Sequence, residues 1–280
     1  MKKIEILTVV LFLVLIGAGN SFSSNPKVEK SEKSKHNKKC YVVLMGGQSN
    51  MLGHGKLSEL VGPVKYDNIK YINFGYSHSL RKAPKSFGPE KGLTKVLAEH
   101  YPKKDFIIYK YAIGGASMYD WAPDYDPEKA KITGNPQFGS VYKKFKSIFN
   151  DSIASKNNIE VVAFLWMQGE SDSKYEQTSN EYFDNFKKLI ERVRKDFDQP
   201  DLPVLFAKVN PQQPKFKYLE KVNAAQKQIA QEVPNAWLIE TNGLSKGNDN
   251  VHYNTEGQLE LGKRFGEQFV KVVHFGEKDK

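Results

Sequence analysis

Cysteine is almost absent from this sequence of 280 residues, in which Cys40 is the only one. No disulfide can therefore form within the chain, and the core must be held together by packing. The chain also lacks an H-E-x-x-H string, a Cys/His cluster and a G-x-x-x-x-G-K phosphate loop. These absences predict a protein without a metal or other cofactor, and Cys40 is expected to be an inert residue at the start of a strand.

Long apolar runs are also scarce. The run Ile6–Ile16, interrupted by one threonine, follows a start with two lysines and precedes small residues, which is typical of a secretory signal peptide and too short for a membrane span. We predict a signal peptide over residues 1–24, a disordered linker over 25–39 and one folded domain over 40–275. The mature protein would be secreted or periplasmic, without stable membrane association, and an uncleaved anchor is the alternative.

Acidic residues are fewer than basic ones, and the formal net charge is +10 with a pI near 9.3. Much of this excess lies at the two ends of the chain, and no basic helix with interleaved aromatic residues is present. We therefore expect no nucleic-acid partner. A solvated surface explains the charge most simply, with an acidic polymer as the alternative binding partner. The protein is expected to be a monomer.

Short apolar runs alternate with amphipathic segments along the rest of the chain. This alternation predicts an α/β domain with a mostly parallel five-stranded sheet and helices on both faces. We expect strands at 41–45, 106–111, 161–166, 204–209 and 237–240. We expect helices at 89–100, 141–154, 180–197, 218–233 and 255–273. Residues 52–88 are less regular and should form an insertion beside the functional site.

The string Gly46-Gly47-Gln48-Ser49-Asn50-Met51 directly follows the first predicted strand. The two glycines permit a sharp turn, and a serine after such a turn is exposed at the carboxyl edge of the sheet, where ligands bind in open α/β sheets. Ser49 is therefore a candidate nucleophile. The alternative is an ordinary helix cap.

Two further polar strings follow the second and third strands. Gly114 and Gly115 leave backbone N–H groups free to hold an oxyanion, unless they form only a plain turn. In the string Trp166-Met167-Gln168-Gly169-Glu170-Ser171-Asp172, the amide of Gln168 can donate and Glu170 can accept or carry charge. A solvated loop with a capping Ser171 or Asp172 is the alternative.

A carboxylate and a histidine follow the fifth strand, three residues apart, as Asp249 and His252. At this spacing the carboxylate can reach Nδ1 of the ring, which directs the other nitrogen outward as a base for a serine hydroxyl. A surface turn followed by a helix cap is the alternative. Because all four strings follow strands of a parallel sheet, we expect them to meet at one edge.

Together these strings resemble the SGNH hydrolase superfamily, specifically its sialate O-acetylesterase-like branch, which includes the carbohydrate esterase family 6 acetyl xylan esterases. The resemblance spans nearly all of residues 40–273. It rests on Gly47-Gln48-Ser49-Asn50-Met51, on Gly114-Gly115 with Trp121, on Trp166 with Gln168-Gly169-Glu170, and on Asp249 with His252. Ser49 does not lie in a G-x-S-x-G string, which separates the chain from the α/β-hydrolases. The usual Asn of the third string is Gln168 here.

The resemblance implies a flavodoxin-like three-layer α/β/α fold and hydrolysis of acetyl esters on carbohydrates. It implies a catalytic triad of Ser49, His252 and Asp249, with the oxyanion held by the N–H groups of Ser49 and Gly115 and by the Gln168 amide. Four residues are expected to bind the substrate: Gln48, Asn50, Trp121 and Glu170. Trp121 would be a wall of the sugar site, or else pack in its loop. Glu170 would bind sugar hydroxyls or order the third loop, rather than act in the triad. An inactive carbohydrate-binding homologue and a lipid or short-chain ester hydrolase are the alternatives.

Overall fold

The computed structural model describes residues 38–63, 65–74 and 85–276. The predicted signal peptide (1–24) and almost all of the predicted linker (25–39) lie outside these residues and stay predictions. The irregular segment predicted at 52–88 is described except for residues 64 and 75–84.

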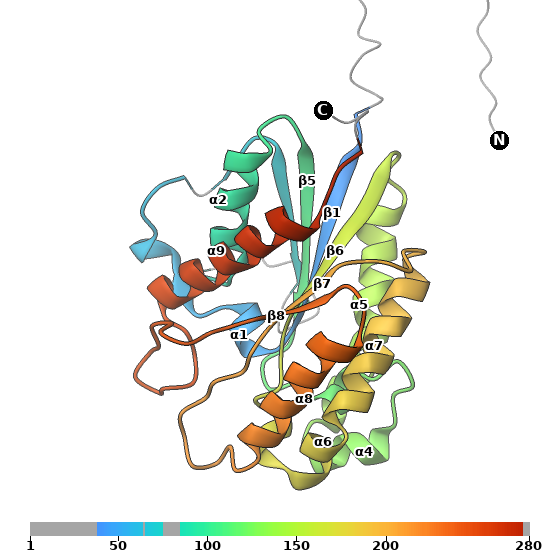
Figure 1. Ribbon diagram of the computed structural model, residues 1–280, viewed down its shortest axis with the longest axis vertical. Coiled ribbons are helices and arrows are strands. Elements are labelled where there is room, and N and C mark those ends of the chain that lie inside the picture. The colour runs from blue at the N-terminus through green and yellow to red at the C-terminus, as the bar shows by residue number, and fades with distance from the viewer. Residues whose placement is uncertain (1–37, 64, 75–84, 277–280) are drawn as a thin grey trace, which may run out of the picture. The chain divides into compact units, whose positions relative to one another are not determined.

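A six-stranded parallel sheet forms the centre of the described domain (Figure 1). Its strands, in spatial order, are β3 (Ile69–Phe74), β5 (Asp105–Ala112), β1 (Cys40–Gly47), β6 (Ile159–Met167), β7 (Val204–Ala207) and β8 (Ala236–Ile239). Every neighbouring pair is parallel. The five predicted strands are all present, but the prediction of five strands was wrong. The additional strand, β3, lies at the edge and belongs to the segment that was expected to be irregular.

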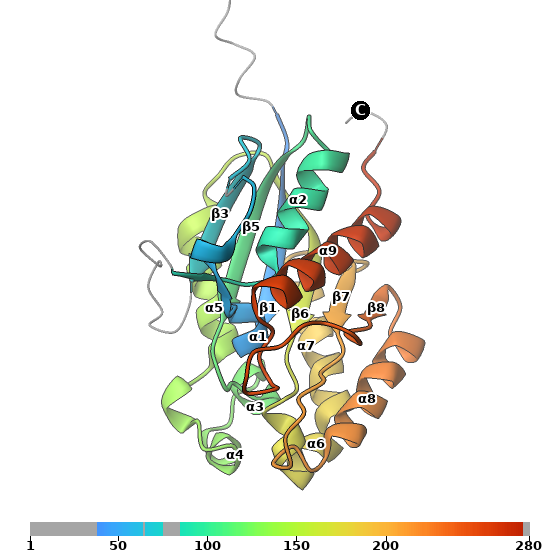
Figure 2. The same cartoon turned by 90° about the vertical axis from the view of Figure 1, so that its left-hand side faces the viewer.

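Helices cover both faces of the sheet (Figures 1 and 2). On one face lie α2 (Glu90–His100) and α9 (Thr255–Val272), and on the other lie α5 (Val141–Phe149), α7 (Tyr182–Asp196) and α8 (Leu219–Glu232). The shorter helices are α1 (Ser49–Leu52), α3 (Met118–Trp121), α4 (Pro127–Ile132) and α6 (Glu176–Asn180), and β2 (Gly55–Lys56) pairs with β4 (Ser86–Phe87) in a separate ribbon. Within the described residues, no helix has the length and apolar character that a membrane span requires.

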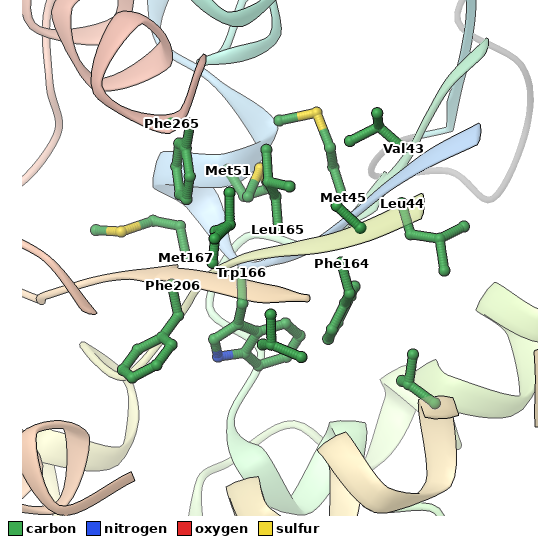
Figure 3. Packing of buried hydrophobic residues seen from close by; sticks show 14 of the residues in the cluster. Val43, Leu44, Met45, Met51, Phe164, Leu165, Trp166, Met167, Phe206 and Phe265 are labelled. Carbon is green, nitrogen blue, oxygen red and sulfur yellow. The ribbon is translucent and has the colours of Figure 1, made fainter. Parts of the chain in front are cut away.

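Alternating side chains of the central strands fill the two layers of the core. Figure 3 shows Met45 and Leu165 on the same face as Phe265 of α9, whereas Phe164 and Trp166 point to the opposite face. All five side chains are buried, and β1 is buried from Tyr41 to its end. A strand covered on both faces reads as a continuous apolar run, which is why β1 could be recognised from the sequence.

The strand order determines where a ligand can bind. Chain connections lead from β1 toward β5 on one side and from β6 toward β7 and β8 on the other, so the order reverses between β1 and β6. In open α/β sheets the crevice at the carboxyl ends of two such strands is the usual ligand site. The loops after β1 and β6 contain Ser49 and Gln168.

Candidate active site

The turn after β1 places Ser49 at the edge of the sheet. Gly47 has a φ of 146°, and a Cβ atom at this position would lie 2.1 Å from the carbonyl oxygen of Met167 on β6. Only glycine therefore fits. The next N–H, that of Gln48, donates to this same oxygen at 3.0 Å. Ser49 then begins the short helix α1, with 8% of its surface exposed.

A buried ion pair supports α1 from the adjacent strand. Lys110 of β5 donates to the carbonyl of Leu52, the last residue of α1, at 3.0 Å and to the carboxylate of Glu90 at 2.6 Å. Glu90 also accepts the N–H of Gly88. Both charged side chains are buried. This pair was not predicted. Its signal in the sequence is Lys110, a charged residue within an otherwise apolar strand.

Ser49, His252 and Asp249 form a continuous hydrogen-bonded chain. The Ser49 Oγ lies 3.0 Å from Nε2 of His252, and Nδ1 of the same ring lies 2.5 Å from Oδ2 of Asp249. Because an ionised carboxylate can only accept, Nδ1 carries the proton and Nε2 is left to accept from the serine hydroxyl. The geometry is that of a nucleophile, a base and a group that orients the base.

The environment of Asp249 keeps its carboxyl ionised. Partial burial acts to raise its pKa, but the N–H groups of His252 and Val251 both donate to Oδ1 at 2.9 Å, and the His252 ring adds a further bond. The net result is a pKa of about 2. The ring of His54, a residue for which no role was predicted, stacks on the ring of His252, and the two ring centroids lie 4.0 Å apart.

Asn50 connects the serine turn to the histidine loop. Its amide donates to Glu170 at 2.6 Å and to the carbonyl of Val251 at 3.2 Å, and its side-chain oxygen accepts the N–H of Tyr253 at 3.0 Å. Because Val251 and Tyr253 flank His252, these bonds hold the base opposite Ser49. Burial raises the pKa of the Glu170 carboxyl despite the Asn50 bond, and its Oε2 has no hydrogen-bond partner among the described residues.

The four residues predicted to bind substrate are all buried. Gln48 is 3% exposed and accepts the N–H of Ser171 at 3.2 Å, while Asn50 and Glu170 hold each other. Trp121 is fully buried, donates from its ring nitrogen to the carbonyl of Gly47 at 3.2 Å, and packs edge-on against Trp166. The prediction that Trp121 forms a wall of a sugar site was wrong, and its alternative, packing within the loop, describes it.

Gly115, in the loop after β5, offers a free backbone donor. Its φ is 82°, and a Cβ atom built on it would meet no other atom within 4 Å, so it borders open space. Among the described residues, neither its N–H nor that of Ser49 has a hydrogen-bond acceptor. Two unused N–H groups at the edge of the crevice are suited to an oxyanion.

Gln168 has a different place from the one predicted. The side chain is fully buried, and its amide donates to the Asp172 carboxylate and, at 3.1 Å, to the carbonyl of Ala116. Both hydrogens of the amide are therefore engaged, and none is left for an oxyanion. Gln168 instead joins the loop after β6 to the loop after β5.

Asp172 lies behind these loops and was considered in the sequence only as a possible helix cap. It is fully buried and accepts the N–H of Met118 at 3.1 Å. Burial raises the pKa of its carboxyl to about 7, although Gln168 and Met118 donate to it. Burial likewise raises the pKa of the neighbouring Asp120.

A groove of about 1360 Å³ opens on the Asp249–His252 side of the site. It runs between residues 54–63 and Tyr66, helices α2 and α9, and the loop 243–249. Its lining mixes lysines and glutamates with apolar side chains, and Tyr66 adds an aromatic ring. Within the described residues, no cluster of His, Cys, Asp and Glu has the arrangement of a metal site.

Known proteins resemble this chain in sequence and in structure. A probable carbohydrate esterase of Arabidopsis thaliana is 31% identical over 111 residues, which are 40% of this chain and 41% of that protein. The chain thus matches less than half the length of this relative in sequence.

Solved structures extend the likeness over most of the chain. A crystal structure of an Arabidopsis thaliana protein covers 85% of this chain and 100% of its own, with a TM-score of 0.67 and 20% identity. The structure of NanS covers 84% of this chain and 98% of its own, with a TM-score of 0.64 and 13% identity. The structure of a carbohydrate acetylesterase from Xanthomonas citri covers 83% of this chain and 56% of its own, with a TM-score of 0.60 and 15% identity. These likenesses concern the fold.

The sequence profile of one family matches residues 38–271, which include all the loops of the candidate site. That family is described as carbohydrate esterase, sialic acid-specific acetylesterase. The chain therefore belongs to this family of carbohydrate esterases.

Proposed function

We propose that this protein is an exported carbohydrate O-acetylesterase that works through an acetyl-enzyme on Ser49. The observation that carries the proposal is the hydrogen-bonded chain from Ser49 through His252 to Asp249, with contacts of 3.0 and 2.5 Å. Family membership supports the ester chemistry and the carbohydrate substrate. The basic and apolar start of the chain supports export.

In the first half of the reaction, Ser49 Oγ attacks the acetyl carbonyl and its proton passes to Nε2 of His252. The carbonyl oxygen becomes an oxyanion that the N–H groups of Ser49 and Gly115 stabilise. Each such donor is typically worth about 3–4 kcal/mol of the barrier. The sugar oxygen then leaves with the proton held by His252, and the acetyl group stays on Ser49.

In the second half, water attacks the acetyl-enzyme and gives its proton to His252. Acetate leaves, and the proton returns to Ser49 Oγ. Asp249 stays ionised throughout, because its pKa of about 2 lies far below neutral pH, and it stabilises the charged imidazole in both halves.

The groove beside Asp249 and His252 supports a glycan as the substrate. Its volume exceeds what a single sugar ring needs, and its lining includes His252, the base that protonates the leaving sugar oxygen. Lysine and glutamate side chains suit hydroxyl groups better than an acyl chain. An inactive homologue would have no need of the assembled Ser49–His252–Asp249 chain.

Replacing the nucleophile tests the proposal. Wild-type protein should hydrolyse p-nitrophenyl acetate and release acetate from at least one substrate in a panel of acetylated polysaccharides and sialic acids. Ser49→Ala should lose nearly all of this activity, whereas Ser155→Ala, which changes an exposed serine, should keep it. A serine-directed phosphonate should label the wild type on Ser49 but not Ser49→Ala. Retention of more than a few per cent of wild-type kcat by folded Ser49→Ala would contradict the proposal.

A further inference from the structure

The carbonyl oxygen of Gly115 accepts two side-chain hydrogen bonds from distant parts of the chain. Ser171 donates from its hydroxyl at 2.6 Å, and Asn135 donates from its amide at 2.8 Å. Ser171 lies in the loop after β6, and Asn135 lies between α4 and α5. A carbonyl oxygen has two lone pairs, so these two donors use its full capacity.

The turn that contains Gly115 is also held by its backbone. Ala116 N–H donates to the carbonyl of Ile113 at 3.2 Å, which closes a four-residue turn, and Ile113 N–H donates to Gly47 at 3.2 Å. The φ of 82° at Gly115 is that of the third residue of a type II turn. The peptide after Gly115 is thus anchored at both its oxygen and its nitrogen, while the Gly115 N–H on the preceding peptide has no acceptor among the described residues.

Ser171 also connects this turn to the nucleophile. Its backbone N–H donates to the side chain of Gln48 at 3.2 Å, and Gln48 directly precedes Ser49. One residue therefore bonds to the serine turn through its backbone and to the Gly115 turn through its hydroxyl. Asn135 adds a second anchor from a segment that none of the four sequence strings includes.

We propose that Ser171 and Asn135 are positioning residues that form a clamp on the Gly115 carbonyl and so aim the Gly115 N–H at the oxyanion. This inference rests on the proposed function. Donors stabilise developing charge best when they are held in place before the reaction. Without the clamp, the turn could still form, but its N–H would no longer have a fixed position relative to Ser49.

Two pairs of variants test the clamp. Ser171→Ala and Asn135→Ala remove its two donors. Ser173→Ala is the control for the first, because Ser173 donates to the carbonyl of Glu170 at 2.9 Å in the same loop. Asn68→Ala is the control for the second, because Asn68 donates to the carbonyls of Tyr101 and Lys104 far from the site. Kinetics with p-nitrophenyl acetate, its pH dependence and thermal midpoints are measured for all variants and for Ser171→Ala/Asn135→Ala.

Each clamp variant should lower kcat by about tenfold, and the double variant should lower it by about a hundredfold. The second decrease approaches the decrease in kcat that follows the removal of one oxyanion donor. KM and the shape of the pH profile should change little, since the His252–Asp249 pair is untouched. Each control should lose similar thermal stability to its partner but keep kcat within about twofold. Equal kcat in clamp and control variants, with an active wild type and an inactive Ser49→Ala, would overturn the clamp and leave the proposed function intact. An inactive wild type would overturn both.

Discussion

Asp249 combines two tasks in one exposed carboxylate. One oxygen contacts the ring of His252, and the other accepts the N–H groups of Val251 and His252. Because nearly half of the Asp249 side chain is exposed, water weakens its electrostatic effect on the ring. Its larger contribution is therefore geometric: it selects the imidazole tautomer that leaves Nε2 free for Ser49.

Replacing this carboxylate by an amide should show the geometric role. In Asp249→Asn, an amide N–H placed against Nδ1 favours the wrong tautomer. We expect kcat for p-nitrophenyl acetate to fall by roughly 10³-fold, less than for Ser49→Ala, while the thermal midpoint falls by only a few degrees. Asn248→Ala, next to it in the same exposed loop, should behave like wild type. Near-normal turnover by Asp249→Asn would remove Asp249 from the mechanism and direct attention to Glu170.

At the scale of the elements, the loop after β6 holds the other loops together. Ser171 bonds to the loops after β1 and β5, and Glu170 accepts from Asn50. Asp172 accepts from Met118 and from Gln168 within its own loop. Because these groups are buried, the bonds prevent unpaired polar atoms, and all except the one between Gln168 and Asp172 also link two loops.

The buried Asp172 predicts a pH-dependent stability. Its folded-state pKa is about 7, whereas an aspartic acid in an unfolded chain has a pKa near 3.9. The folded protein therefore keeps a proton that the unfolded chain releases, and this contribution to stability is lost as the pH rises from about 4 to about 7. Asp172→Asn cannot ionise. Its free energy of unfolding, relative to wild type, should rise by about 2–4 kcal/mol between pH 4 and pH 8.

Urea denaturation at several pH values measures this difference. Asp124→Asn, which changes an exposed aspartate beyond α3, is the control and should follow the wild-type profile. Parallel profiles for Asp172→Asn and wild type would show that Asp172 is ionised in the folded protein at neutral pH.

At the scale of the described domain, the sheet and its two helical layers place His252 between Ser49 and the groove. His252 faces Ser49 through Nε2 and also lines the groove with Asp249. In the proposed mechanism, the sugar oxygen that leaves the acetyl carbon would be protonated by a residue that lines the groove, and the rest of a glycan chain would lie along α2 and α9.

Groove variants should distinguish a glycan from a small ester. Lys95 is exposed on α2, and both Lys95 and Tyr66 line the groove. In Tyr66→Leu/Lys95→Ala, KM for an acetylated oligosaccharide should rise about three- to tenfold, because a few contacts worth about 1 kcal/mol are lost. Kinetics with p-nitrophenyl acetate should stay unchanged. Lys187→Ala, on α7 at the other face of the sheet, should affect neither substrate, and an unchanged oligosaccharide KM in the groove variant would exclude this binding path.

Local patterns were sufficient for most of the fold. The buried strands β1, β5, β6, β7 and β8 appear as short apolar runs, and the long helices have apolar residues at helical spacing. The edge strand β3 was missed, because Lys70 is exposed and Tyr71 only half-buried. Lysine and asparagine interrupt the apolar run of β3, whereas β8 at the other edge of the sheet is apolar throughout and was therefore predicted.

The sequence by itself determined the α/β class and brought Ser49, Gly115, Asp249 and His252 to one edge, because strand endings and glycine turns are local properties. Only the tertiary structure decided which neighbouring polar side chains are buried. Gln48, Asn50, Gln168 and Trp121 lie in the same strings or just after them, yet all are buried, and Asn135 reaches Gly115 from outside the four strings. Burial and bonding of this kind depend on how loops from different strands cross, and that crossing is not encoded in the spacing of any one string.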